Sequence, residues 1–338
     1  MAETLMKAVV VPRFGGPEVL ETRDMPIGEP GSGQILIQVA YAGVNNTDLW
    51  SRQGRHRPAL PFIPGYEVAG TIRALGEGVE GFRVGQDVSA LTVGGGYAEF
   101  VLAQAALTFP LDTFASKIDL QQAAVFPTVA LTAYGMLQHS ARMREGESIL
   151  IHSASGGVGM AAGQIARALG AQLVLGTIGN EKHAASACSF GYDQIFPVNG
   201  FEQAVIEATD GKGIDIVLDA RGEPTRSQSL SVLAPLGRLV VFGDASGNPE
   251  KLISPNELWR SNKAVVGYSI TTLSQTTPHL LTTMARQTLQ LMAEGALKLA
   301  ISETLPLSQA AEAHRRIEAR SHVGKLLLQV REQTSEGG

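Results

Sequence analysis

The chain has 338 residues, of which 44% are hydrophobic and 17% charged, a size and composition that predict two domains with substantial buried cores. Its net charge is −5 and its basic residues are scattered, so we expect no nucleic-acid partner. A single cysteine, Cys188, excludes an internal disulfide and a thiolate metal cluster. The sequence shows no signal peptide and no apolar run of the roughly 18 residues that span a membrane, so we expect a soluble, cytoplasmic protein.

The first part of the chain has the pattern of a compact, mostly antiparallel β domain. Short β-rich runs at 34–44 and 65–76 are separated by glycine and proline, and turn signals recur at close intervals through 76–91.

The middle of the chain changes to strands that alternate with helices. The strands are predicted at 148–154, 171–178, 214–220 and 237–247. This alternation predicts βαβ units around a doubly wound parallel sheet.

The last part of the chain is expected to return to the first domain. Helix signals around 279–295 and 308–319 precede a final strand at 324–332. We therefore predict one domain from residues 1–122, completed by about 268–338, and a second from residues 123–267.

Residues 151–159, with the sequence IHSASGGVG, join a predicted strand to a predicted helix. Against the dinucleotide fingerprint G-x-G-x-x-G, the three glycine positions hold Ala154, Gly156 and Gly159. Gly156 and Gly157 would let the backbone approach a pyrophosphate, and Gly159 would let helix and strand pack closely. We predict that the turn Ser155, Gly156, Gly157, Val158 and Gly159 binds the phosphates of a nucleotide cofactor at the helix N-terminus.

The end of the next predicted strand indicates which cofactor is bound. An acidic residue there would bind the ribose hydroxyls of NAD, but this chain has Gly176 and Thr177. Small residues leave room for a 2′-phosphate, and Lys182 is placed to pair with it. We predict NADP(H), with Gly176, Thr177 and Lys182 at the cofactor; the alternative for Lys182 is an exposed helix lysine.

Nearly the whole chain resembles the medium-chain dehydrogenase/reductase superfamily, and within it the zinc-free quinone oxidoreductase branch that includes the zeta-crystallins. The resemblance rests on MKAVVV (6–11), GVNNTDLWSRQG (43–54), PFIPGYEVAG (61–70), GGYAEFVLA (95–103), AAVFPTVALTAYGML (123–137) and ASGGVGMAAGQIARALGA (154–171). It implies a GroES-like β-rich catalytic domain, a Rossmann nucleotide-binding domain and a homodimer or homotetramer.

The resemblance also identifies the positions at which zinc alcohol dehydrogenases of this superfamily hold their catalytic metal. This chain has Asn45, Tyr66 and Thr128 there, and none of these is a good zinc ligand. We therefore expect no zinc. Without a Lewis acid, the easier reaction is hydride delivery from NADPH to an acceptor that is already electrophilic.

The candidate catalytic residues follow from the same resemblance. Asn45 is expected near the nicotinamide ribose and the substrate, Thr128 near the nicotinamide, and the Tyr66 phenol could donate to a substrate oxygen, although it could equally pack as an apolar residue. His56 stands where the related enoyl reductases have a tyrosine that is regarded as the proton donor, and its alternative is a loop histidine. Asp48 is expected to position its loop.

Further residues are assigned to the substrate and the cofactor. Trp50 would line a slot for a flat ring, and Arg52 would close the entrance. The backbone of Phe242 and Gly243 is expected to pass near the nicotinamide carboxamide, and Lys325 to approach the cofactor, as the corresponding positions do in relatives.

The resulting prediction is a zinc-free, NADPH-dependent reductase of quinones or α,β-unsaturated carbonyls. An enoyl-thioester reductase is the enzymatic alternative, and it would need a basic entrance such as Arg52, Arg55 and Arg57 could form. A low-turnover NADPH-binding protein is the alternative from another class. The apolar segment 262–270 is expected either to pair with its symmetry mate in a homodimer or to be an internal strand.

Overall fold

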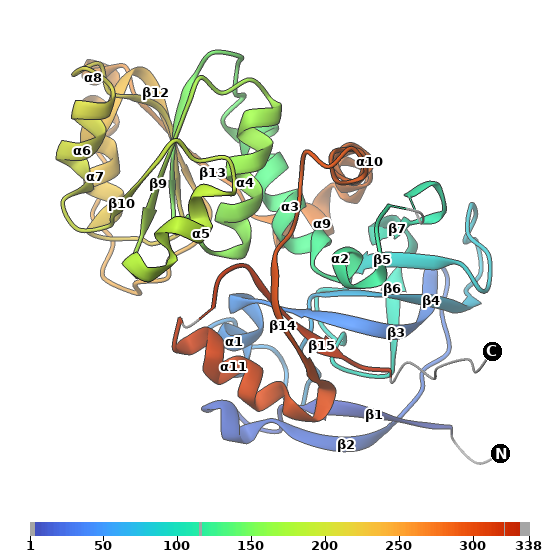
Figure 1. Cartoon of the computed structure of the whole chain (residues 1–338). Helices are drawn as coiled ribbons and strands as arrows, with labels where there is room; N and C mark the ends of the chain where they lie inside the picture. The colour runs from blue at the N-terminus through green and yellow to red at the C-terminus, as the bar shows by residue number, and fades with distance from the viewer. Residues whose placement is uncertain (1–3, 115–116, 321, 332–338) are drawn as a thin grey trace. The chain divides into compact units, whose positions relative to one another are not determined.

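The computed structural model describes residues 4–114, 117–320 and 322–331 (Figure 1). Their contacts divide the chain into two compact units. Unit 1 consists of residues 1–128, 271–293 and 299–338, and unit 2 of residues 129–270 and 294–298. The domain boundaries that the sequence predicts, at 122/123 and 267/268, differ by a few residues from this division by contacts and remain a prediction.

Unit 1 is built on a mostly antiparallel sheet of seven strands. Their order is β14-β15-β3-β4-β5-β7, with β6 also paired to β3, and only the β14–β15 pair is parallel. A separate antiparallel pair is formed by β1 and β2. The strands are β1 (Leu5–Val10), β2 (Glu21–Pro26), β3 (Gln34–Val44), β4 (Glu67–Leu75), β5 (Asp87–Leu91), β6 (Phe100–Gln104), β7 (Thr108–Pro110), β14 (Ile301–Pro306) and β15 (Lys325–Gln329).

The helices of unit 1 are short except for one near its end. They are α1 (Asn46–Arg52), α2 (Leu120–Ala124), α9 (Ile270–Thr276, whose first residue belongs to unit 2), α10 (Pro278–Ala293) and α11 (Ala310–Glu318).

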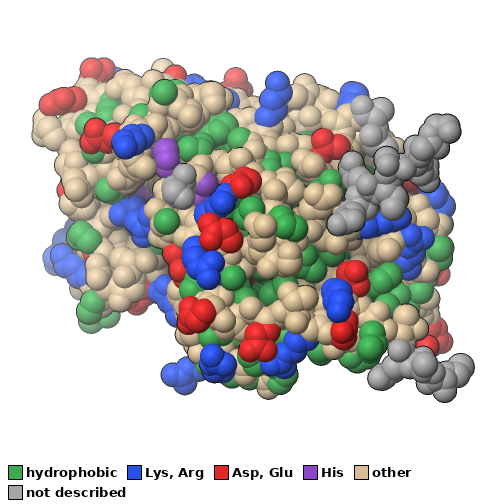
Figure 2. All heavy atoms as spheres, turned by 60° about the horizontal axis from the view of Figure 1, so that its bottom comes forward, with side chains coloured by type: hydrophobic (Ala, Val, Ile, Leu, Met, Phe, Trp, Pro, Cys, Tyr) green, Lys and Arg blue, Asp and Glu red, His purple; other side chains and the backbone are tan. Residues whose placement is uncertain are grey.

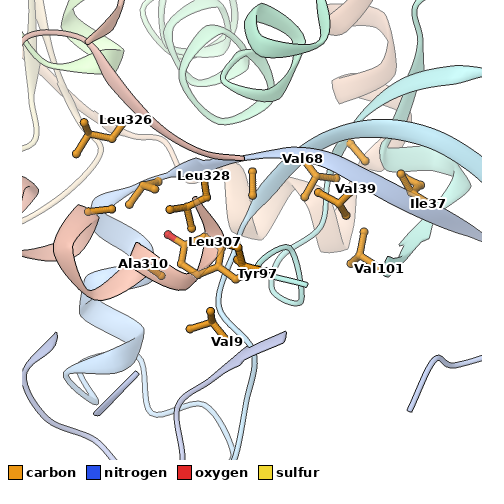
Figure 3. Close-up of a cluster of buried hydrophobic side chains, with 14 of the residues drawn as sticks. Val9, Ile37, Val39, Val68, Tyr97, Val101, Leu307, Ala310, Leu326 and Leu328 are labelled. Atoms are coloured by element: carbon orange, nitrogen blue, oxygen red, sulfur yellow. The ribbon is translucent and has the colours of Figure 1, made fainter. Parts of the chain in front are cut away.

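The core of unit 1 follows from the alternation along β3. Ile35, Ile37 and Val39 are buried while the residues between them are partly exposed, as expected for a strand with one face against a core. Val39 packs in one cluster with Val68 of β4, as Figure 3 shows. Full burial of side chains of this size contributes about 1.5–3 kcal/mol each.

The return of the chain to unit 1 brings distant residues together. β15 pairs antiparallel with β3, with Leu326 opposite Val44. Lys325 therefore lies beside the end of β3, where Asn45 begins the turn into α1. The predicted final strand is thus present, and its pairing places one end of the chain next to a candidate site residue.

Unit 2 has a six-stranded parallel sheet. The strand order β10-β9-β8-β11-β12-β13 corresponds to 3-2-1-4-5-6, the Rossmann order. The strands are β8 (Ser148–His152), β9 (Leu173–Ile178), β10 (Gln194–Pro197), β11 (Ile214–Asp219), β12 (Leu233–Val241) and β13 (Ala264–Gly267). The predicted parallel sheet is confirmed, and β13 is its edge strand rather than an internal one.

Helices cover both faces of this sheet. In Figure 1, α4 and α5 lie on one side of it, and α6 and α7, which contact each other, lie on the other. The helices are α3 (Phe126–Gly135, whose first three residues belong to unit 1), α4 (Gly157–Ala168), α5 (Ala184–Cys188), α6 (Phe201–Ala208), α7 (Thr225–Val232) and α8 (Pro255–Ser261), with a single π-helical turn at Met136–Ser140. Leu150, Leu175 and Val217 are among the buried residues that join the sheet to its helices.

Within the described ranges, no helix combines the length and the hydropathy that crossing a membrane requires.

Candidate functional site

The turn after β8 has the geometry of a phosphate-binding site. Ser153 adopts a left-handed backbone with φ of +60°, and Gly156, in an extended conformation, caps α4 without a side-chain hydrogen bond. The first N–H groups of a helix have no partner within the helix, so at α4 they remain available to an anion. A Cβ on Gly159 would lie 2.3 Å from the Ser153 carbonyl oxygen. The predicted turn therefore fits the pyrophosphate of a dinucleotide.

The end of β9 contributes to packing rather than to polar contacts. A Cβ on Gly176 would lie 2.8 Å from the Ala154 Cβ, so a glycine is needed there for β9 to approach the turn. Thr177 is fully buried, and its hydroxyl lies 2.8 Å from His152 Nδ1. We therefore correct the cofactor assignment of Thr177, because its side chain is already engaged in the core.

His152 is a neutral, structural histidine. Its Nε2 lies 2.8 Å from Ser229 Oγ, whose own proton is donated to the Thr225 carbonyl oxygen. Nε2 must therefore carry the imidazole proton, and Nδ1 accepts from Thr177. Burial, and to a lesser degree Arg221, lower the pKa of His152 to about 3. The residue ties β8 and β9 to α7 without carrying charge.

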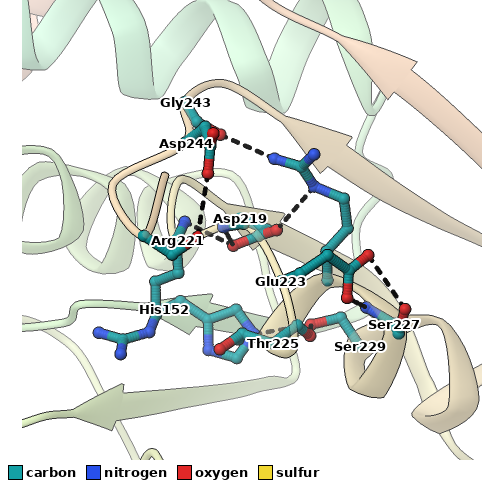
Figure 4. A network of polar contacts seen from close by, with 12 residues as sticks. His152, Asp219, Arg221, Glu223, Thr225, Ser227, Ser229, Gly243 and Asp244 are labelled. Carbon is teal, nitrogen blue, oxygen red and sulfur yellow. Dashed lines mark hydrogen bonds and ion pairs between the residues drawn. The ribbon is translucent and has the colours of Figure 1, made fainter. Parts of the chain in front are cut away.

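A buried ion pair positions the loop that follows β12 (Figure 4). Asp219, the last residue of β11, accepts from Arg226 Nε at 3.2 Å, and Arg226 Nη2 donates to the Gly243 carbonyl oxygen at 2.9 Å. Phe242 N donates to the Asp219 carbonyl oxygen at 3.0 Å. This network holds the predicted cofactor residues Phe242 and Gly243 at the carboxyl edge of the sheet, where Rossmann ligands bind.

Lys182 lies on a short 3₁₀ turn, Glu181–His183, after β9. Its side chain is exposed and forms no ion pair with any residue that the structure describes. This placement is compatible with phosphate pairing, and the assignment remains a prediction.

In unit 1, Asn45 is held between two buried charges. Its Nδ2 donates to Glu67 Oε1 at 2.9 Å, and its Oδ1 accepts from Lys325 Nζ. Lys325 Nζ also lies 2.7 Å from Glu67 Oε1 and 2.9 Å from the Val44 carbonyl oxygen. The opposite orientation of the Asn45 amide would put its NH₂ group against the Lys325 ammonium, so the orientation with Oδ1 toward Lys325 is the correct one. Of the two N–H groups on Nδ2, one is used by Glu67 and the other remains for a ligand.

This arrangement changes the role assigned to Lys325. The residue is buried, and its three N–H donors are used by Glu67, Val44 and Asn45. We correct its predicted cofactor contact: Lys325 positions Asn45 instead.

Thr128 presents a polar group without a partner. Its backbone N donates to Glu67 Oε2 at 2.8 Å, whereas its hydroxyl oxygen is buried and has no hydrogen bond within the described part of the chain. Buried hydroxyls are normally satisfied, so this one is a candidate for a ligand contact. The predicted role of Thr128 near the nicotinamide stays a prediction with this observation in its favour.

Asp48 positions the start of α1. It accepts from Asn45 N at 2.9 Å and from Gly65 N at 2.7 Å, forming a capping box with Asn45. Burial raises the pKa of Asp48 to about 7, against the opposing effects of the two N–H donors and Lys325. This agrees with the predicted role of Asp48 in holding its loop.

Arg52 is not an entrance residue. It is fully buried, pairs with Glu318 and donates from Nη1 to His314 Nδ1 at 3.3 Å. Since an arginine only donates, His314 carries its proton on Nε2 and donates to the Tyr97 hydroxyl, which in turn bonds Asp48. Burial, and then Arg52, lower the pKa of His314 to about 3. The predicted substrate contact of Arg52 is wrong, because α11 covers its side chain.

Trp50 of α1 forms a partly exposed group with His56 and Tyr66, which follow that helix. The Trp50 and His56 rings meet edge to face with centroids 5.8 Å apart, and the Arg55 guanidinium lies 5.1 Å from the centroid of the Trp50 ring. Burial raises the pKa of Tyr66, and burial followed by Arg55 lowers the pKa of His56. The group combines an apolar ring with two side chains that can carry a proton.

The positions that hold zinc in the zinc alcohol dehydrogenases do not fit a metal here. Asn45 Oδ1 faces an ammonium, and both oxygens of Glu67 already accept hydrogen bonds. In the ranges that the structure describes, no three His, Cys, Asp or Glu side chains are grouped as a metal site.

Comparison with known proteins matches both parts of the chain. Residues 31–113 match the alcohol dehydrogenase GroES-like domain, and residues 157–286 match the domain described as zinc-binding dehydrogenase. A human quinone oxidoreductase is 37% identical over 334 residues, which is 96% of this chain and 98% of the relative. The chain belongs to the zeta-crystallin-like quinone oxidoreductase family of the medium-chain dehydrogenases/reductases.

Solved structures of this family have the same fold. A quinone oxidoreductase from Escherichia coli, solved in complex with NADPH, has a TM-score of 0.86 at 29% identity and covers 96% of this chain and 99% of its own. One from Pseudomonas syringae has a TM-score of 0.88 at 32% identity, covering 96% and 100%. The GroES-like and Rossmann architectures predicted from the sequence are therefore confirmed.

Sequence reasoning missed three groups of the site. The Asp219–Arg226 pair, the His152 bridge and the His314–Tyr97 chain all consist of polar residues within or beside buried elements. The His314–Tyr97 chain had a detectable signal, because its two ends, Arg52 and Asp48, lie close together in the sequence. Arg52 follows Asp48 by four residues on a helix, so the two share a face.

Proposed function

We propose that the chain is an NADPH-dependent reductase that transfers hydride to a quinone or to an α,β-unsaturated carbonyl without a catalytic metal ion. The observation that carries this proposal is the environment of Asn45, which is bound by Glu67 and by the Lys325 ammonium where zinc enzymes of the superfamily have a metal ligand. Family membership and the NADPH complex of the Escherichia coli relative support the cofactor.

NADPH supplies the hydride when it is bound. In unit 2, the N–H groups of the turn Ser155–Gly159 bind its pyrophosphate, and Lys182 pairs with its 2′-phosphate. The backbone at Phe242 and Gly243, held by Arg226, contacts the carboxamide.

Unit 1 handles the acceptor and the proton. The remaining N–H of Asn45 and the hydroxyls of Thr128 and Tyr66 orient the acceptor and stabilise the oxyanion that develops on its oxygen. One such donor is worth about 2.7–4 kcal/mol of transition-state stabilisation. Trp50 lines the pocket, and the proton comes from His56 or from water.

The structure weakens the thioester alternative. That reaction needs a basic entrance for phosphates, and Arg52 is withdrawn into the core. On the face shown in Figure 2, basic and acidic side chains are interspersed, which disfavours a nucleic-acid partner.

The proposal predicts turnover that does not depend on a metal ion. We expect the purified protein to oxidise NADPH with naphthoquinone or a trans-2-enone at rates that 1,10-phenanthroline leaves unchanged, and to use NADH less well. Loss of NADPH absorbance measures the rate, and elemental analysis measures bound zinc. Stoichiometric zinc together with chelator inhibition would exclude the metal-free reaction, and NADPH binding without turnover of either acceptor would favour the low-turnover binding protein.

The role of Lys182 is tested by reversing its charge. Lys182→Glu should weaken NADPH binding about 10-fold, equivalent to about 1.4 kcal/mol, and leave NADH binding unchanged, because only NADPH carries the 2′-phosphate. Lys212→Glu, at another exposed lysine of unit 2, is the matched control. Titration by cofactor fluorescence gives both dissociation constants, and equal effects of the two variants on NADPH would remove Lys182 from the site.

We also propose a homodimer formed through the outer edge of β13. The outer edge of β13 has no partner strand among the described residues, and nearby Leu252 and Trp259 are 94% and 72% exposed. Leu252 precedes α8 and Trp259 lies on it, and Leu252, Leu258 of α8 and Leu230 of α7 help to line a hollow of about 490 Å³. A single-chain mass in light scattering would contradict the dimer. The cytoplasmic location remains a prediction from the sequence.

A further inference from the structure

Ser51 connects the two proton-carrying side chains, Tyr66 and His56. The residue lies on α1 and is buried, and its Oγ lies 3.2 Å from the Tyr66 hydroxyl and 3.4 Å from His56 Nδ1. A serine hydroxyl donates one hydrogen bond and accepts two, and its proton rotates freely, so it can take a proton on one side and release one on the other. Such contacts are often long before the substrate is bound and shorten in the loaded complex.

The surroundings give this chain of groups a direction. His56 is exposed and can exchange protons with water, whereas Ser51 is buried and Tyr66 is half-buried. The Trp50 ring holds the imidazole from one side at a centroid distance of 5.8 Å. The charged groups that act on the chain are Arg55 at the His56 end and Asp48 at the Tyr66 end. The path thus leads from solvent at His56 to the half-buried hydroxyl of Tyr66.

We propose that Ser51 relays a proton from His56 to Tyr66, so that these three side chains act as one donor to the reduced acceptor. This inference rests on the function proposed above. Tyr66 gives its hydroxyl proton to the acceptor oxygen, which has received the electron pair with the hydride. The Tyr66 oxygen then takes the Ser51 proton, and the Ser51 oxygen takes the Nδ1 proton of the charged His56, which leaves a neutral imidazole with its proton on Nε2. The exposed ring then takes a proton from water at Nδ1, and each side chain is back in its starting state.

The relay replaces two separate assignments by one. On sequence grounds, Tyr66 and His56 are independent candidates for the proton donor. The geometry makes Tyr66 the group that contacts the acceptor, His56 the group that contacts water, and Ser51 the positioning residue that joins them.

The decisive experiment is a double-mutant cycle on the full chain. Ser51→Ala and His56→Gln should each lower kcat for the quinone about 100-fold. The double variant should be no slower than either single variant, because each of these substitutions interrupts the same proton path. Ser51→Thr keeps the hydroxyl and should recover most of the rate. Ser32→Ala, at an exposed serine of unit 1, should match the unchanged protein.

The pH dependence separates a relay from a structural role. The charged form of His56 supplies the proton, so the rate should fall as pH rises through its pKa, which burial and Arg55 place below 6.5. This fall in rate with rising pH should be absent in Ser51→Ala. A readout without turnover comes from the ultraviolet titration of tyrosine: loss of the Ser51 contact should raise the pKa of Tyr66 further, with Tyr66→Phe identifying its transition.

The outcomes distinguish the relay from the reductase itself. The relay is overturned, and the reductase stands, if the unchanged protein reduces the quinone and Ser51→Ala keeps both the fall in rate with rising pH and the unchanged tyrosine titration. The same conclusion follows if the effects of the two single substitutions multiply in the double variant. If the unchanged protein reduces no acceptor, both proposals fall.

Discussion

Replacing Lys325 by methionine is expected to lower the free energy of unfolding of unit 1 by about 3–5 kcal/mol, because it leaves the buried Glu67 carboxylate without its partner. Asn45 would lose the donor that fixes its amide oxygen, and a catalytic group displaced by about 1 Å can cost about 100-fold in rate. Thermal unfolding and quinone-dependent NADPH oxidation measure the two effects.

The same variant should show an unusual pH dependence through Asp48. The pKa of Asp48 is raised to about 7 in the folded state from 3.8, so between about pH 4 and 7 the native protein binds more protons than the unfolded chain. Stability therefore falls as pH rises through this window, by up to about 1.4 kcal/mol per pH unit. Lys325 lowers the pKa of Asp48, so its removal should extend the fall to higher pH.

Two comparisons test the cause of the effect. Lys212→Met removes an equivalent charge at an exposed position and should change stability by about 0.5 kcal/mol or less. The double variant Lys325→Met with Glu67→Gln removes both buried charges and should regain much of the lost stability. A Lys325→Met protein as stable as Lys212→Met would refute the structural role of the ammonium.

The limits of the sequence prediction are clearest at this cluster. The strands β3 and β15 are evident as runs of apolar residues, and the phosphate turn is evident because its glycines lie within one short stretch. The contact between Asn45 and Lys325 spans 280 positions, and it depends on the register in which β15 pairs with β3. No local pattern carries that register, so Lys325 could be assigned only by resemblance.

Arg52 and Thr177 show the same limit, because the sequence assigned both to ligands and both have buried protein partners instead. Both side chains are polar and lie near motif residues, so the sequence favours a ligand contact for each. In the structure their partners are His314 and His152, each held by elements far along the chain. A buried histidine that satisfies two hydrogen-bonding groups cannot be told from a functional one until its neighbours are known.

Replacing Gly159 by alanine is expected to weaken NADPH binding about 100-fold. The new Cβ would lie 2.3 Å from the Ser153 carbonyl oxygen and 2.9 Å from the Ala154 Cα, so the turn before α4 must move. Its N–H groups would then no longer meet the pyrophosphate, and each hydrogen bond to a charged group is worth about 1.5–3 kcal/mol. Fluorescence titration with NADPH measures the dissociation constant.

Two other glycines of unit 2 separate the phosphate cradle from general packing. A Cβ on Gly163, further along α4, would lie 2.4 Å from the Phe190 carbonyl oxygen, so Gly163→Ala should cost stability, about 1–3 kcal/mol, with a smaller effect on the cofactor. Gly179 has open space around it, so Gly179→Ala should change neither quantity. Equal loss of NADPH binding in the Gly159 and Gly163 variants would mean that the cofactor responds to the stability of α4. A loss confined to Gly159 would mean that it responds to the shape of the turn, because a Cβ on Gly159 meets the residues of the turn and a Cβ on Gly163 does not.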